Sequence, residues 1–316
     1  MIEAGSIELT QARVLARHGE RLTAADWRRI EAMRDWAPAL ELARATALRP
    51  WLEGITADSG VVAIEAALRR HWRGVVAEVA AWMPRAWQPA VRWCAWLPEL
   101  PLVQHLARGG DPPAWMRDDE AWRAVAAAPA TSRAAVLAAG PAGALAASWA
   151  APEDAGRAWL AEWRRRLPAD GCDGDDAATR VIPDSTRPPL AALVRALHAH
   201  ARTFRVAAAS QGWALRGTLR SELVRLLRRS ALQPAIAFVH LALCALDFER
   251  LRAELLRRVI FPAWKVAWCC VRVRRAGSRF SPRATTPRSS SKRWRAPATS
   301  SSRRAAARRC RRCSAT

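Results

Sequence analysis

Two pairs of side chains in this sequence have spacings that could support metal binding or nucleophilic chemistry. His240 and Cys244 stand four residues apart, which places both on one face of a helix, and Cys310 and Cys313 form a single CxxC. A structural zinc site needs four ligands, and neither pair has a second pair at a suitable spacing. We therefore expect no metal site and no cofactor.

Acidic residues cluster in two places. Asp118, Asp119 and Glu120 follow Trp115, and a negatively charged first turn of the next helix accounts for them. The run 170–176 is rich in Asp but lacks the ligand order of a calcium loop. Because the sequence also has no phosphate-binding Gly-rich loop, nucleophile elbow or HExxH motif, we expect no catalytic residues and no enzyme activity.

The composition predicts that helices position these residues. The chain has 316 residues, of which 51% are hydrophobic, with 17 Trp and no Tyr. Ala, Leu, Arg and Glu are strong helix formers, and runs of β-branched and aromatic residues bounded by turn signals are missing. The expected fold class is all-α, with helical bundles.

The order of Pro, Gly and charge along the chain suggests five segments. These are a helical lobe 1–110, a connecting region of short helices 111–166, an acidic Pro/Gly linker 167–189, a second helical lobe 190–262 and a basic tail 263–316. We expect a break of the second lobe near Gly217. A capping box at Thr23 is expected to begin an early helix.

The longest helix expected in the first lobe has an apolar face and a charged face. Its apolar residues recur every three or four positions: Val61, Ile64, Leu68, Trp72, Val75, Val79 and Trp82. Glu65 and Arg69 belong to the set expected on the opposite, solvated face. In the second lobe, Ile236, Val239, Leu243 and Leu246 predict a buried face.

The net charge of +23 is concentrated in the tail. Residues 263–316 hold 16 of the 51 Lys and Arg and none of the 28 Asp and Glu. This composition is typical of a disordered segment. Two explanations stay open, a basic arm that binds nucleic acid or another polyanion, and out-of-frame translation of a GC-rich gene.

The N-terminus lacks the basic start and apolar run of a signal peptide, so we expect a cytoplasmic protein with free thiols. The longest convincing uncharged run, 230–246, is shorter than the roughly 20 residues of a membrane span.

An internal repeat links the two lobes. Residues 86–91 read Ala-Trp-Gln-Pro-Ala-Val, and residues 231–236 read Ala-Leu-Gln-Pro-Ala-Ile. Each follows an Arg-studded amphipathic segment and opens a more apolar one. A repeat of this kind indicates a duplicated helical unit.

The stretches 12–110 and 217–261 resemble the C/d-type stalk-seating family of V-type rotary ATPases. The resemblance rests on Ile64-Glu65-Ala66-Ala67-Leu68-Arg69-Arg70, on Leu102-Val103-Gln104-His105-Leu106-Ala107-Arg108 and on Leu246-Asp247-Phe248-Glu249-Arg250-Leu251-Arg252. It implies a repeated, funnel-like arrangement of helical bundles that sits on the membrane rotor ring and seats the central stalk without chemistry of its own.

The resemblance implies partners among the other ATPase proteins, the rotor ring proteolipid and the central stalk, and peripheral membrane association through them. Arg108 and Arg252, near the ends of the two repeats, are the expected contact residues, although solvated helix ends would look the same. The alternatives are a helical scaffold unrelated to rotary ATPases and a polyanion-binding protein that acts through the Arg-rich tail.

Overall fold

The structure is a computed structural model, which describes residues 6–168 and 187–261. These residues form twelve α-helices joined by short 3-10 turns, with no strand among them, so the predicted all-α class is confirmed. The α-helices are α1 (Ile7–Gly19), α2 (Ala24–Ala32), α3 (Trp36–Arg44), α4 (Val61–Trp82), α5 (Gln88–Trp93), α6 (Leu100–Ala107), α7 (Arg123–Ala127), α8 (Arg133–Ala139), α9 (Ala155–Arg165), α10 (Arg187–Val206), α11 (Gly212–Arg229) and α12 (Ala235–Ile260). The 3-10 turns that matter below are η2 (Arg85–Trp87), η3 (Cys94–Glu99) and η4 (Ala114–Arg117).

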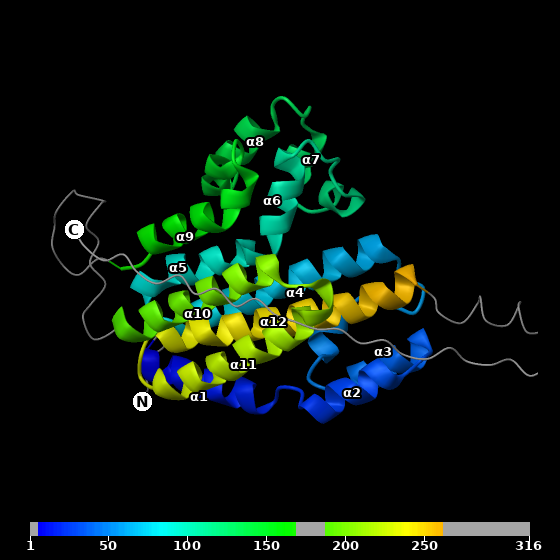
Figure 1. Ribbon diagram of the computed structural model, residues 1–316, viewed down its shortest axis with the longest axis vertical. Helices are drawn as coiled ribbons and strands as arrows, with labels where there is room; N and C mark the ends of the chain where they lie inside the picture. The colour runs from blue at the N-terminus through cyan, green and yellow to red at the C-terminus, as the bar shows by residue number, and fades with distance from the viewer. Residues whose placement is uncertain (1–5, 169–186, 262–316) are drawn as a thin grey trace, which may run out of the picture. The chain divides into compact units, whose positions relative to one another are not determined.

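Helix α12 lies at the centre of the packing. It contacts α1, α4, α10 and α11, and Figure 1 shows it alongside α4 and α11. Glu65 pairs with Arg252 and Trp72 meets Phe248, so α4 and α12 run in opposite directions. The two stretches expected as separate lobes, 1–110 and 190–262, therefore contribute to one core.

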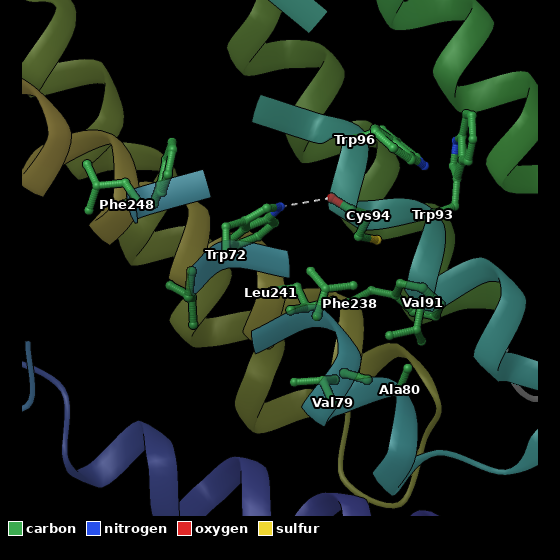
Figure 2. Packing of buried hydrophobic residues seen from close by; sticks show 14 of the residues in the cluster. Trp72, Val79, Ala80, Val91, Trp93, Cys94, Trp96, Phe238, Leu241 and Phe248 are labelled. Atoms are coloured by element: carbon green, nitrogen blue, oxygen red, sulfur yellow. Dashed lines mark hydrogen bonds between the residues drawn. The ribbon is translucent and has the colours of Figure 1, made fainter. Parts of the chain in front are cut away.

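The first half of α12 is buried on every side. Besides the predicted Ile236, Val239 and Leu243, the side chains of Phe238 and Leu241 are buried as well. Figure 2 shows Phe238 and Leu241 facing residues of α4 and α5. Because neighbours surround it, this segment is apolar all round rather than amphipathic. No helix in the described ranges is long and apolar enough to cross a membrane.

The charged face expected on the helix 61–82 differs in the structure. Helix α4 spans the predicted residues and buries Ile64, Leu68 and Trp72, but Glu65 and Arg69 are buried too, and Val61 is exposed. The expectation that Glu65 and Arg69 are solvated was wrong, because each finds an oppositely charged partner inside the protein.

Proline and glycine explain most of the remaining boundaries. Pro98 and Pro101 divide the stretch 88–107 into α5, η3 and α6. Gly217 lies inside α11, so the predicted break there was wrong, and the chain turns between Val206 and Gly212 instead. The capping box at Thr23 is present, with Asp26 accepting from the Thr23 backbone.

The two copies of the repeat both lie at the start of a helix. Pro89 is in the first turn of α5, and Pro234 directly precedes α12. The positions that follow are fully buried in both copies, Ala90 and Val91 in one, Ala235 and Ile236 in the other. Trp87 and Phe238, one from each copy, bring their ring centroids to 6.4 Å. After this common start the copies diverge, because α12 continues without proline.

Part of the predicted organisation falls on other residues. Helix α10 begins at Arg187, so the last three residues of the expected linker 167–189 are helical. The rest of that linker from 169 and the tail 263–316 lie outside the described residues. The funnel-like arrangement stays a prediction.

Candidate functional site

A cavity of about 200 Å³ lies between α1, α4 and α12. His240 and Cys244 line it from α12, and His71 lines it from α4. The His71 ring packs against Trp51, with ring centroids 4.3 Å apart. The structure thus brings the His240–Cys244 pair, which the sequence places on one helix face, to the wall of a cavity.

The His240–Cys244 pair has the wrong electrostatics for nucleophilic catalysis. The Cys244 Sγ lies 3.6 Å from the His240 Nε2. Burial lowers the pKa of His240 to about 3, and the charge of Arg21 adds to this shift. Burial raises the pKa of the Cys244 thiol to about 12. A reactive cysteine needs a lowered thiol pKa, so this pair stays neutral and unreactive near pH 7.

Arginine closes the side of the cavity next to this pair. Arg21 donates to the Leu243 carbonyl oxygen at 2.7 Å and pairs with Asp247 at 2.5 Å. Arg220 of α11 pairs with the other oxygen of Asp247. Asp247 therefore ties α1, α11 and α12 together, and its carboxylate is occupied by two guanidinium groups.

A buried network of ion pairs connects α4, α12 and the segment between η3 and η4. The Arg69 Nε lies 3.1 Å from Glu99, which is 1% exposed, and a second nitrogen of Arg69 pairs with Glu65. Arg252 reaches Glu65 from α12 at 2.7 Å. The Arg69 guanidinium also stacks over the ring of Trp115, 4.2 Å from its centroid.

Arg73 extends this network to the acidic cluster of the sequence. It donates to Asp119 through two nitrogens, one of them at 3.1 Å, and lies 4.0 Å from Glu99. Asp119 also accepts from the backbone N–H of Ala121 at 3.0 Å. The residue that the sequence assigns to the charge of a helix start is thus an internal counter-ion for Arg73.

The two buried glutamates of the network differ in pKa. Burial raises the pKa of Glu99, and the charge and hydrogen bond of Arg69 oppose this effect only in part. Burial acts in the same direction on Glu65, but hydrogen bonds and charge from Arg252 and Arg69 outweigh it and lower the pKa of Glu65. These shifts arise from packing partners, which is the behaviour of a structural network as well as of active sites.

The predicted partner-binding residues have different surroundings. Arg108 is exposed just after the end of α6, and no ion pair holds it among the described residues. The Arg252 guanidinium is half-buried and bound to Glu65. No hydrogen bond or ion pair joins Arg108 to Arg252, and their role in partner binding stays a prediction.

A larger groove of about 660 Å³ lies between α2, α11 and α12. Four arginines line it, and three of them have acidic partners: Arg250 pairs with Glu31, Arg257 with Glu254, and Arg220 with Asp247. The fourth, Arg216, packs on aromatic rings instead. The sequence-based prediction missed this surface, although the dense arginines of 187–229 with a single acidic residue were a signal for it.

Metal binding finds no support in the described part of the chain, where no three His, Cys, Asp or Glu side chains are grouped to hold an ion. Cys310 and Cys313 and the Asp-rich run 170–176 lie outside it. No family model matches the sequence, and no curated protein and no solved structure is similar to it.

Proposed function

We propose that this chain is a non-catalytic helical protein that works by binding other proteins. The observation that carries the proposal is the use of its reactive side chains. The described acids and bases with shifted pKa values hold helices together, as Glu65, Glu99 and Arg252 do, or are held neutral by burial, as His240 and Cys244 are.

We further propose that its partners are the membrane rotor ring and the central stalk of a V-type rotary ATPase. The sequence resemblance suggests these partners, and the repeat supports a duplicated helical unit, because its two copies share a helix start with the same buried positions. A protein that seats a stalk on a ring transmits force through packed helices. The buried ion pairs that join α4, α12 and the segment from η3 to η4 suit that role.

The tagged full-length chain, isolated from its source cells, should bring down the ring proteolipid and the central-stalk proteins. An Arg108→Glu variant should recover less of them, because it reverses the charge of an exposed helix end. Arg70→Glu is the matched control, since Arg70 is exposed on a different helix. Isolation that recovers no other part of the ATPase would contradict the rotary assignment and leave an unrelated helical scaffold as the better account.

The non-catalytic part of the proposal has its own test. The purified chain should neither bind ATP saturably nor hydrolyse it, because its glycines form no phosphate-binding loop. Saturable nucleotide binding measured by calorimetry, or turnover above a heat-inactivated sample, would show that this part is wrong.

A further inference from the structure

Exposed apolar side chains gather where α10 turns into α11. Phe204 is 38% exposed, Val206 86% and Trp213 49%. Nine large apolar side chains are exposed in the described residues, and these three of them lie within ten positions of one another. Single exposed apolar residues need no explanation, but a group at the tip of a helical hairpin indicates a binding surface. We call Phe204, Val206 and Trp213 the hairpin tip.

The hairpin that carries the tip is strongly basic. Residues 187–229 contain nine Arg and a single acidic residue, Glu222. Six of these arginines are exposed and form no ion pair within the described residues: Arg195, Arg202, Arg205, Arg225, Arg228 and Arg229. A surface with this charge attracts an anionic partner.

The geometry of the tip distinguishes between anionic partners. The Arg216 guanidinium lies over both aromatic rings, 4.6 Å from the Phe204 centroid and 4.8 Å from that of Trp213. Nucleic-acid bases stack on open aromatic faces, and Arg216 already covers one face of each ring. Val206, the most exposed of the three, has no aromatic face at all.

We propose that the hairpin tip inserts into the surface of a bilayer that contains anionic phospholipids. Aromatic and aliphatic side chains enter the boundary between headgroups and acyl chains, where Trp is especially favoured. The arginines around them, Arg202 and Arg205 first, then meet the negatively charged headgroups. This attachment needs no membrane-spanning helix and no partner protein, so it goes beyond the proposed function and does not depend on it.

Sedimentation of the full-length chain with lipid vesicles tests the proposal. The chain should bind vesicles of phosphatidylcholine mixed with phosphatidylglycerol, and bind vesicles of phosphatidylcholine alone much more weakly. Val206→Asn/Trp213→Gln should weaken binding to the anionic vesicles by about tenfold or more, because it removes the inserted apolar surface but no charge. The matched control is Leu15→Asn, an equally exposed apolar residue on α1 that should leave binding unchanged.

The basic tail 263–316 can add electrostatic attraction, but it is identical in all three proteins and so cancels in the comparison. Hydrogen exchange gives a second readout, since anionic vesicles should protect the backbone of 204–213. If the double variant folds and binds anionic vesicles as the unchanged chain does, the proposal is wrong. Unchanged vesicle binding together with lost binding to single-stranded RNA would assign the tip to nucleic acid instead.

Discussion

Arg69 is the residue on which the buried ion-pair network depends most. It alone donates to both Glu65 and Glu99, and its guanidinium stacks on Trp115. Breaking a buried pair by removing one partner leaves an uncompensated charge, whereas replacing both partners with apolar groups can be nearly neutral. The network therefore adds little net stability but penalises any arrangement that separates its members.

Arg69→Met should lower the free energy of unfolding by about 3–5 kcal/mol, because Glu99 loses its closest counter-ion inside the protein. Urea denaturation measures this. Arg70→Met, on the exposed side of the same helix, should change stability by no more than about 0.5 kcal/mol. Adding Glu99→Leu to Arg69→Met should restore part of the loss, and a double variant weaker than both single variants would contradict the network account.

His240 predicts a pH dependence. Its pKa is lowered to about 3 from 6.5 by burial, so below pH 6.5 the unfolded chain takes up a proton that the folded chain refuses. Stability that is fully present above pH 6.5 is then lost as the pH falls towards 3.

His240→Gln, which cannot be protonated, should lose about 2 kcal/mol less than the unchanged chain between about pH 6.5 and pH 5. Chemical denaturation at several pH values measures the difference. The exposed His198→Gln serves as the control. Parallel stability curves for His240→Gln and the unchanged chain would show that His240 is solvated.

Among the helices, α12 illustrates both what the sequence predicts and what it cannot. Periodicity finds Ile236, Val239 and Leu243, because apolar residues at this spacing form a face whatever packs on it. The remaining burial of Phe238 and Leu241 depends on α4 and α5, which are distant in sequence. Likewise the partners of Glu65 and Arg69 lie 187 and 30 positions away, and one sequence gives no signal for such pairs.

Leu243→Asp tests the central position of α12. Leu243 is fully buried beside α1, so an unpaired carboxylate there should cost several kcal/mol, on the order of 4. Ala253→Asp, exposed on the same helix, should have an effect within about 1 kcal/mol. Thermal unfolding compares the two, and an unchanged melting temperature for Leu243→Asp would mean that this part of α12 is exposed.

At the scale of the whole chain, the described residues form one packed unit in which both copies of the repeat meet. The sequence predicts the all-α class from composition, since helix propensity is a local property. Which reactive residues become structural is not local, because it depends on which helices bury them. The cavity at His240 and Cys244 demonstrates this, since the same pair would be reactive beside a solvent-exposed cation and is unreactive in an apolar wall.

The central claim is that the chain serves as a non-catalytic partner in a rotary assembly. Reciprocal isolation tests it most directly: a central-stalk protein is tagged in the source cells, and the amount of this chain that follows it is quantified by mass spectrometry. The account predicts recovery in a fixed ratio to the stalk that persists at high salt, where weak binding through basic residues is screened. Recovery no greater than from untagged cells would contradict it.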